Sequence, residues 1–272
     1  MNDRNTTPTS NREGMQSQKQ SILEISGVDK TFGGLVAIHQ LSFNVSPGEI
    51  VAIIGPNGSG KTTLFNLISG FLSPTRGEIR FDGQNLGGLA PHHIASKGVA
   101  RTFQLIQIFT NMSIIENVMA GRHLRSRAGM FQTAFRLPPT KTEEKDIYDA
   151  AMRNLALVGL ETNAQEQPLS LPYGKQKLLE IARALATEPR LIMMDEPAGG
   201  LSTREIEELA RLVYSIRDSG ITVLLVEHRM ELALNVADRV IVLNFGEKIA
   251  EGPPSLVQTN EQVIAAYLGE EF

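Results

Sequence analysis

The stretch GPNGSGKT, residues 55–62, constrains this chain more than any other part of its sequence. It fits the pattern G-x-x-x-x-G-K-[ST], in which a glycine-rich loop connects a β-strand to an α-helix and encloses phosphate groups. The flanking residues meet that requirement, because the apolar run EIVAIIG leads into the loop and KTTLFNLISGF reads as a helix after it. A chance Gly-Lys-Thr turn is the alternative, and the spacing and context disfavour it.

Each residue type in this loop has a physical role in binding phosphate. Glycines let the chain curl so that successive backbone N–H groups, from about Asn57 to Thr62, point inward. Lys61 is expected to reach the β and γ oxygens and to neutralise charge during catalysis, and the Thr62 hydroxyl is expected to ligate Mg²⁺. The predicted nucleotide-binding residues of the loop are Gly55, Pro56, Asn57, Gly58, Ser59, Gly60, Lys61, Thr62 and Thr63.

The rest of the chain continues to alternate apolar runs with helical patterns. Short β-like runs occupy residues 22–45, and RGEIRFDG, residues 76–83, reads as an edge strand that ends in an Asp-Gly turn. Helical segments such as 203–219 separate later apolar runs at 191–194, 222–226 and 239–243. This alternation favours an α/β fold with a parallel sheet covered by helices.

A helical insertion is expected between about residues 105 and 187, where no convincing strand occurs. Its periodicity is clearest at Ile147, Ala151, Leu155 and Val158. Residues 97–145 carry eight Lys or Arg against three Glu, a local excess of five positive charges. That excess fits a solvated helical face, and the alternative is attraction to a partner or to anionic lipid head groups.

Composition excludes several classes of function. Lys and Arg number 26 against 30 Asp and Glu, so the net charge of −4 gives no argument for nucleic-acid binding. The absence of Cys removes disulfides, thiolate metal sites and cysteine nucleophiles. Residues 1–20 contain no Val, Leu, Ile or Phe, and we expect a disordered tail there. No apolar run approaches the roughly 18 residues of a membrane helix.

Two adjacent acids follow the apolar run LIMM in LIMMDEP, residues 191–197. The strand would deliver Asp195 and Glu196 to its carboxyl end, where ligands bind in open α/β sheets. We expect Asp195 to hold Mg²⁺, through a water, and Glu196 to polarise the attacking water as general base. A helix cap is the alternative for such a pair, and the nearby phosphate loop favours catalysis.

Two further polar residues close apolar runs. His228, in VEHRM, follows the strand TVLLV, from where its imidazole could contact the γ-phosphate or hold the attacking water. Gln104, in RTFQ, could bridge Mg²⁺ or water and register the γ-phosphate. Taken singly, a structural histidine and an exposed loop glutamine are the alternatives.

The stretch LPYGKQKLLEIARALA, residues 171–186, begins a helix without Ser, Thr, Asp or Asn at its start. Gly174 leaves backbone open at the positive end of the helix and Lys175 stands beside it, which suits an anion. A loop glycine before a buried helix is the alternative reading of these residues.

The phosphate loop, RTFQ, LPYGKQ, MMDEPAGGL and VEH, in this order, resemble the ATP-binding subunits of ABC transporters from about Ile22 onward. The resemblance implies an ABC ATPase domain over residues 21–272, with a mostly parallel sheet, an N-terminal antiparallel β-subdomain and an inserted α-helical subdomain at about 105–187. It also implies that Tyr173, Gly174 and Lys175 bind ATP held by a second subunit, and that Phe32 stacks on adenine.

Four positions of these motifs depart from the family pattern, and two of them are Tyr173, in place of a glycine, and Lys175, in place of a glutamine. Pro172 stands where the family has serine and offers neither a hydroxyl nor an N–H. Ser202 stands where the family usually has aspartate, and Ser202-Thr203-Arg204-Glu205 also fits a capping box at a helix start. We therefore expect a working phosphate clamp of altered detail.

Finer features resemble the ATPases of branched-chain amino acid importers, including the C-terminal tail at about residues 250–272. The resemblance implies Mg·ATP hydrolysis in a homo- or heterodimer that drives two membrane permease subunits, with a periplasmic or lipid-anchored solute-binding protein acting indirectly. It places the chain at the cytoplasmic face of the inner membrane and implies no nucleic-acid partner. An importer of urea, amides or another polar solute, or a soluble ABC ATPase without a transport role, remains the alternative.

Overall fold

The computed structural model describes residues 21–122 and 141–268. The predicted disordered tail and residues 123–140 of the basic stretch lie outside the described residues. The strands are β1 (Leu23–Phe32), β2 (Leu35–Val45), β3 (Ile50–Ile54), β4 (Arg76–Phe81), β5 (Gln84–Asn85), β6 (Val99–Arg101), β7 (Leu191–Asp195), β8 (Thr222–Val226), β9 (Arg239–Asn244) and β10 (Glu247–Gly252). The α-helices are α1 (Lys61–Ile68), α2 (Pro91–Ser96), α3 (Ile114–Arg122), α5 (Lys141–Leu157), α6 (Tyr173–Leu185), α7 (Thr203–Asp218), α8 (Met230–Val236), α9 (Pro254–Val257) and α10 (Glu261–Leu268).

The larger sheet has the strand order β10-β9-β3-β8-β7-β6. Strands β9, β3, β8, β7 and β6 run parallel, and β10 pairs antiparallel with β9. Every residue of β3, β7 and β8 is buried. Continuous burial of this kind is expected where both faces of a parallel sheet are covered.

Alternate residues of these strands face two different cores. Ile50, Ala52 and Ile54 of β3 pack in the core formed with α6, α7 and α8. Val51 and Ile53 pack in the second core, with residues of α1 and of the smaller sheet. The period of two along β3 therefore puts α6 on one face of the large sheet and α1 on the other.

The smaller sheet is antiparallel, in the order β2-β1-β4-β5. Our expectation that residues 76–83 form an edge strand is wrong, because β5 pairs with the outer side of β4. The Asp-Gly turn itself is confirmed, since Asp82 and Gly83 have φ angles of 50° and 72° and return the chain onto β4. Two positive φ angles give the tight hairpin turn that matches strand twist.

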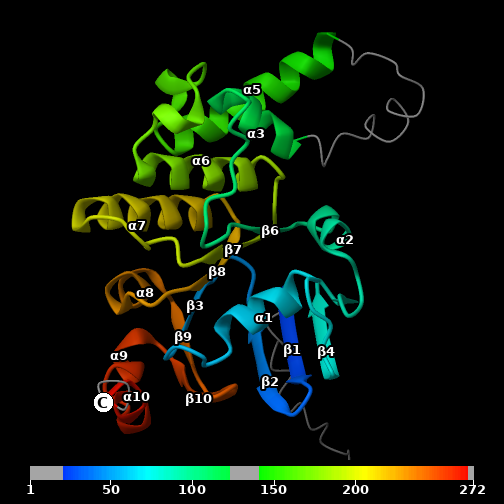
Figure 1. Ribbon diagram of the computed structural model, residues 1–272, viewed down its shortest axis with the longest axis vertical. Helices are drawn as coiled ribbons and strands as arrows, with labels where there is room; N and C mark the ends of the chain where they lie inside the picture. The colour runs from blue at the N-terminus through cyan, green and yellow to red at the C-terminus, as the bar shows by residue number, and fades with distance from the viewer. Residues whose placement is uncertain (1–20, 123–140, 269–272) are drawn as a thin grey trace, which may run out of the picture.

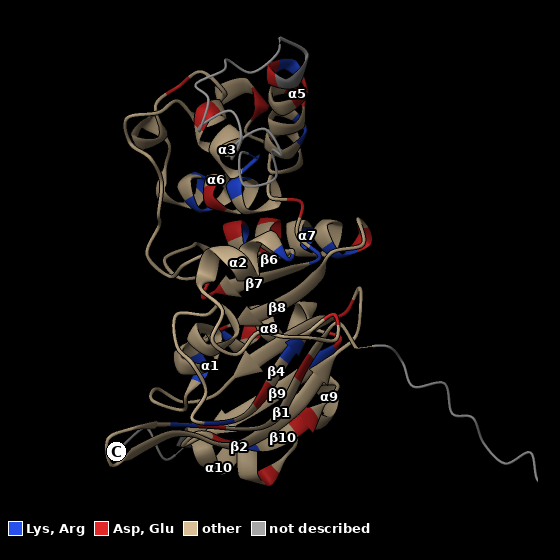
Figure 2. Ribbon diagram, turned by 90° about the vertical axis from the view of Figure 1, so that its right-hand side faces the viewer, with Lys and Arg blue, Asp and Glu red and all other residues tan. Residues whose placement is uncertain are grey.

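Helices α3, α5 and α6 pack together at one end of the molecule, and β1, β2 and β10 lie toward the other end in both views (Figure 1, Figure 2). The periodic residues Ile147, Ala151 and Leu155 of α5 are buried, as their spacing predicts. The predicted α/β fold, with a mostly parallel sheet, an antiparallel sheet and inserted helices, is confirmed. Within residues 21–122 and 141–268, none of the helices has the length and apolar character to span a bilayer.

Lysines and arginines are interspersed with acidic residues along the helices and strands (Figure 2). Three described members of the basic stretch make side-chain contacts within the chain. Arg101 pairs with Asp195 and Arg122 with Glu188, while Lys97 donates to the side chain of Gln84. Of these three side chains only that of Arg101 is buried, whereas Lys97 and Arg122 are partly exposed and Lys145 of the same stretch is exposed. The other basic side chains of the stretch lie outside the described ones.

Candidate nucleotide site

The phosphate loop connects β3 to α1 and approaches the neighbouring backbone closely. At Gly60, φ is 103° and a Cβ would lie 2.8 Å from the carbonyl oxygen of Ala37. Only glycine fits a left-handed position with backbone that close. The loop thereby lies against β2, and Gly60 is the N-cap of α1.

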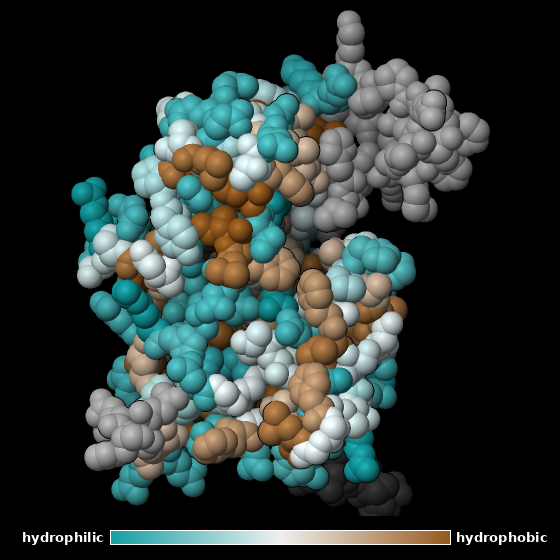
Figure 3. All heavy atoms as spheres, viewed as in Figure 1, coloured by the Kyte–Doolittle hydropathy of each residue, from teal (hydrophilic) through white to brown (hydrophobic). Residues whose placement is uncertain are grey.

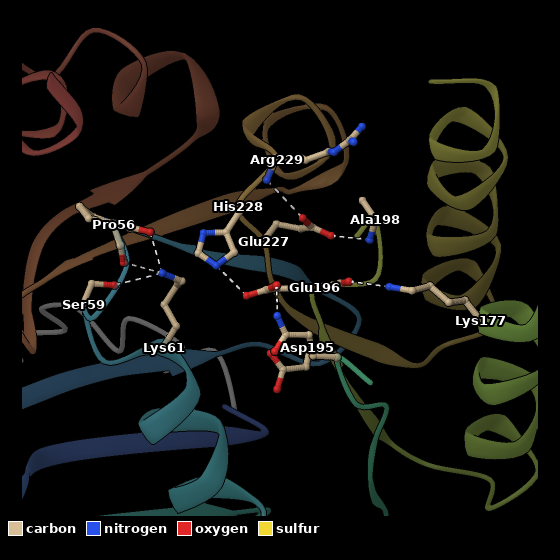
Figure 4. A network of polar contacts seen from close by, with 12 residues as sticks. Pro56, Ser59, Lys61, Lys177, Asp195, Glu196, Ala198, Glu227, His228 and Arg229 are labelled. Carbon is tan, nitrogen blue, oxygen red and sulfur yellow. Dashed lines mark hydrogen bonds and ion pairs between the residues drawn. The ribbon is translucent and has the colours of Figure 1, made fainter. Parts of the chain in front are cut away.

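Lys61 lies inside the loop and is 5% exposed. Its Nζ donates to the carbonyl oxygens of Gly55 at 2.6 Å and Pro56 at 2.7 Å, and to Ser59 Oγ at 3.3 Å (Figure 4). The N-terminus of α1 has no side-chain cap, and Thr62 is exposed there. An uncapped helix start with an ammonium group beside it fits a bound polyphosphate.

Glu196 lies at the end of β7 and connects the polar residues of the site. Its Oε1 lies 2.6 Å from His228 Nε2 (Figure 4). Its Oε2 accepts a hydrogen bond of 2.6 Å from Gln104 Nε2. The Glu196 backbone has a φ of 48° and its N–H donates to the carbonyl of Val226. A non-glycine residue held in this region carries strain, which is typical of functional positions.

The structure therefore brings together three residues that the sequence analysis selected separately. Gln104 follows β6, Glu196 follows β7 and His228 follows β8, so parallel neighbours deliver all three to one edge of the sheet. The phosphate loop follows β3, the next strand in the order, at the same edge. Ligands of open α/β sheets bind at this edge.

Asp195 is 5% exposed and its Oδ2 lies 2.7 Å from Arg101 Nη2. Its carboxylate and the hydroxyl of Thr62 are oxygen donors of the kind that Mg²⁺ prefers, together with phosphate oxygens. Among the described residues, no three His, Cys, Asp or Glu side chains are grouped as metal ligands. The donor set thus fits a magnesium ion that arrives with a nucleotide rather than a site made entirely by protein.

Two buried charged residues that the sequence analysis did not select support the backbone around Glu196. Glu227 is 1% exposed and accepts hydrogen bonds from the backbone of Ala198 and Arg229. Lys177, from α6, donates to the carbonyls of Glu196 and Pro197 at 3.0 and 3.3 Å (Figure 4).

Burial raises the pKa of Glu227, with the nearby charge of Glu196 acting in the same direction. Burial lowers the pKa of Lys177. The available sequence signal was a charged residue inside an otherwise apolar pattern, as in VEH and in the helix after LPYG.

The start of α6 differs from what its sequence suggested. Pro172 is the N-cap without a side-chain hydrogen bond, and Lys175 is exposed. Gly174, however, is buried against its own chain, because a Cβ there would lie 2.3 Å from Glu205 Oε1. Tyr173 packs on Gly200, where a Cβ would lie 2.9 Å from the ring. A carboxylate thus stands beside the predicted phosphate clamp.

That carboxylate belongs to the capping box at the start of α7, which is confirmed. Glu205 accepts hydrogen bonds from the N–H and the hydroxyl of Ser202, at 2.9 and 2.6 Å. Those hydrogen bonds lower the pKa of Glu205. Ser202 therefore has a structural role at this position.

The remaining predicted residues lie in two places. Phe32, at the end of β1, is 45% exposed with Lys30 Nζ 5.0 Å from its ring centroid. Tyr173, Gly174 and Lys175 belong to α6, on the opposite face of the large sheet from α1. The structure does not bring these three residues to the phosphate loop of the same chain.

Comparison with known proteins identifies the family of the chain. A family model described as ABC transporter matches residues 38–199, more than half of the chain. A second, described as branched-chain amino acid ATP-binding cassette transporter, matches residues 247–272.

Two similar proteins are the high-affinity branched-chain amino acid transport ATP-binding proteins BraF of Pseudomonas aeruginosa and LivG of Escherichia coli. BraF is 41% identical over 250 residues, covering 92% of this chain and 98% of BraF. LivG is 41% identical over 252 residues, covering 92% of this chain and 99% of LivG.

Similar solved structures are also ATP-binding cassettes of ABC transporters. The ADP conformation of an ATP-binding cassette of an ABC transporter matches with a TM-score of 0.80 and 32% identity, covering 92% of this chain and 99% of that one. A dimeric bacterial ABC transporter cassette matches with a TM-score of 0.73 and 27% identity, covering 85% of this chain and 98% of that one. The resemblance in sequence motifs is confirmed, and the chain belongs to the family of ABC transporter ATP-binding cassettes.

Proposed function

We propose that this chain is the ATP-hydrolysing subunit of an ABC importer, and that the solute is a branched-chain amino acid. The observation that carries the proposal is the Glu196 carboxylate held between Gln104 and His228 beside the phosphate loop. The names of the similar proteins and the C-terminal family match support the solute. A urea or amide importer, or an ABC ATPase without a transport role, is the alternative.

The residues of the site divide the work of hydrolysis. Lys61 exchanges the carbonyls of Gly55 and Pro56 for phosphate oxygens, and the amides from Asn57 to Thr63 bind the same oxygens. Phe32 supports the adenine ring. Glu196 accepts a proton from the attacking water, while His228 and Gln104 hold the two carboxylate oxygens of Glu196. Catalysis then rests on positioning and charge neutralisation.

Magnesium would be held by Thr62, Asp195 and Gln104. When bound, it would neutralise phosphate charge. The contact between Gln104 and Glu196 uses the amide nitrogen of Gln104, which leaves the amide oxygen for the ion. One side chain can therefore hold the catalytic carboxylate and contact the metal.

A second ATPase subunit, the same chain or a related one, would complete each site with Tyr173, Gly174 and Lys175. This proposal is supported by the position of α6, which packs on the opposite face of the large sheet from α1. The dimeric form of a similar cassette supports it as well. This proposal includes no nucleic-acid partner.

Each ATPase subunit has an apolar groove of about 680 Å³, which is lined by α2, α3, α6 and the segment after Gln104. The two membrane permease subunits would each bind the groove of one ATPase subunit. Phe71 and Phe109 line this groove and are 54% and 49% exposed. Figure 3 shows apolar atoms gathered on the face where the segment from β6 to α3 runs. This contact would hold the chain at the cytoplasmic face of the inner membrane, with the solute-binding protein outside it.

Cysteine cross-linking tests the groove directly, because the chain has no Cys of its own. Phe109→Cys should cross-link to a permease in membranes that contain the complete transporter. Ser219→Cys, at the far end of α7, is the matched control and should not. Equal cross-linking at both positions would refute the groove as the contact.

The site is tested with Glu196→Gln. The variant should bind ATP as the wild type does and should hydrolyse it about 1000-fold more slowly, because the general base is lost. ATP should also drive its dimerisation, measured by size-exclusion chromatography with light scattering. Normal hydrolysis by the variant would refute the assignment of Glu196.

The solute is tested by uptake into proteoliposomes that hold the whole transporter. ATP-dependent accumulation of leucine or isoleucine, absent with Glu196→Gln, is the expected result. Accumulation of urea instead would favour the alternative importer. Purification of the chain with RNA or DNA, and without permeases, would favour a role outside transport.

A further inference from the structure

The Arg101 guanidinium lies buried against Asp195, and the proposed hydrolysis gives it no part. Its side chain is 7% exposed, that of Asp195 is 6% exposed, and Nη2 lies 2.7 Å from Oδ2. A buried ion pair is costly to form unless further hydrogen bonds complete it. The surroundings of Arg101 provide such bonds.

The remaining contacts of Arg101 come from α1 and from aromatic rings. Its Nη1 donates to Asn66 Oδ1 at 2.7 Å and to Ser69 Oγ at 2.8 Å. The rings of Phe65, Phe71 and Phe103 surround the guanidinium carbon, with centroids 5.5, 5.8 and 5.0 Å away. The guanidinium is thus fixed to the same helix that begins at the phosphate loop.

This geometry controls the Asp195 carboxylate. Arg101 takes Oδ2 and leaves Oδ1 outside the ion pair. A planar guanidinium fixed through Nη1 cannot follow the carboxylate if the carboxylate turns, so the orientation of Oδ1 is set before any cation arrives. Residues that orient metal ligands in this way commonly control metal affinity.

Arg101 also lines the apolar groove, together with Ser69, Phe71 and Phe103. Its Nε is buried and is the one buried side-chain nitrogen or oxygen without a hydrogen-bond partner in the described part of the chain. The orientation of Asp195 is therefore set from the side of the molecule that we propose faces the permease.

We propose that Arg101 is a positioning residue for magnesium, which aligns Asp195 so that Mg·ATP binds at low magnesium concentration. This inference rests on the proposed function, because it assumes that Asp195 holds the ion. It assigns to Arg101 no contact with substrate or metal.

The test compares Arg101→Met, which can keep the packing among the three rings, with Arg101→Lys, which keeps the charge. Displacement of a fluorescent nucleotide measures ATP binding, first in EDTA and then as Mg²⁺ is added. In EDTA all forms should agree within about twofold, because Lys61 and the loop amides hold the phosphates. In Arg101→Met, the Mg²⁺ concentration that produces half of the full change in ATP affinity should be about 10- to 100-fold higher than in the wild type. Arg101→Lys should recover part of that loss.

A double-mutant cycle separates positioning from general stability. In an Asp195→Asn background, Arg101→Met should have no further effect on the Mg²⁺ requirement. If Arg101→Met does not fold, Asn66→Ala combined with Ser69→Ala frees Nη1 without removing the charge, and should still raise the requirement at least about threefold.

A folded Arg101→Met protein with an unchanged Mg²⁺ requirement, or an unchanged requirement in the substitute variant, overturns the inference. Wild-type protein that binds no ATP in EDTA or in Mg²⁺ would instead refute the proposed function, so the two failures are distinguishable.

Discussion

The N-termini of α1 and α6 look alike in sequence and differ in structure. Both helices begin without a side-chain cap, next to a glycine and a lysine. At α1 the loop folds around Lys61, and at α6 the Glu205 carboxylate stands against Gly174. A bare helix start is therefore not by itself an anion site, because the neighbouring charge decides what it can bind.

The difference shows which half of the nucleotide site a single chain can build. The phosphate loop, Glu196, Gln104 and His228 meet at one edge of the sheet and need no other copy to be in place. The start of α6 offers Lys175 and its backbone, but it packs on the other face of the large sheet from α1 and carries a negative neighbour. We expect the first half to bind ATP alone and the second to bind only phosphates brought by a partner.

The largest effect that tests this division is that of His228→Ala. Glu196 loses the contact at Oε1 and keeps the one from Gln104, so the carboxylate can move by about 1 Å, a misplacement that costs about 100-fold in kcat. ATP affinity should change less than about threefold, since Lys61 and the amides are untouched. Steady-state hydrolysis and equilibrium nucleotide binding measure the two quantities.

His39→Ala is the matched control, because His39 is exposed and pairs with Asp29 outside the site. It should leave both quantities unchanged. Equal losses of affinity and turnover in His228→Ala would show that the first half is not assembled independently of its catalytic residues.

A second test compares the two glycines. Gly60→Ala places Cβ 2.8 Å from the Ala37 carbonyl at a φ of 103°, and should lower the unfolding free energy by about 1–3 kcal/mol. Gly174→Ala meets the flexible end of Glu205 and gains helix propensity, so its stability should stay within about 1 kcal/mol of wild type. Urea unfolding of both variants measures the difference, and similar losses would contradict it.

The same comparison changes how the clamp should be probed. Gly174→Asp would place its new carboxylate against Glu205 of its own chain as well as near a partner's phosphates. Loss of dimerisation in that variant has two causes that cannot be separated. Substitutions at Glu205 or at the exposed Lys175 avoid the clash.

Local patterns predicted the fold and most of the site. The apolar run before the loop determined β3, and parallel strands brought Gln104, Glu196 and His228 to one edge. Strand β10 was not predicted, because the sequence EKIAEG is only partly apolar and its last residues were assigned to the C-terminal tail at about residues 250–272. Strand β4 was misplaced at the edge, because the two residues of β5 are too few to form a pattern.

Contacts between distant residues account for what could not be predicted. Arg101 and Asp195 are 94 positions apart, and the periodicity around RTFQ gives no sign that the arginine points inward. Glu205 approaches Gly174 only through the packing of α7 on α6. Side-chain pairing across elements depends on tertiary geometry, which hydrophobic spacing does not encode.

A third test concerns pH and the buried carboxyls around α6. Burial raises the pKa of Glu180 and of Glu227. The folded state then holds these protons more tightly than the unfolded state, so the stability that these two groups contribute is greatest below about the unfolded pKa of 4.5 and falls as pH rises through the raised values. Glu227→Gln should remove part of that fall.

Thermal unfolding from pH 4 to pH 8 measures this loss of stability with rising pH. Glu207→Gln is the control, because Glu207 is an exposed residue of α7. A wild-type protein that gains stability steadily over this range, with no difference in Glu227→Gln, would contradict the assignment of these buried groups.

The smallest expected effect removes the charge that distinguishes the two helix starts. Glu205→Gln keeps the capping box, since glutamine can accept from the Ser202 N–H, but takes a negative charge away from Gly174. A charge at a helix N-terminus is worth about 0.3–1 kcal/mol, so ATP-driven dimerisation of a Glu196→Gln protein should tighten about two- to fivefold for each ATP bound. Sedimentation velocity measures it, and Glu207→Gln makes the same charge change on α7 away from the clamp. If dimerisation weakens or does not change, the Glu205 carboxylate does not oppose the partner's phosphates, and the contrast between α1 and α6 has another cause.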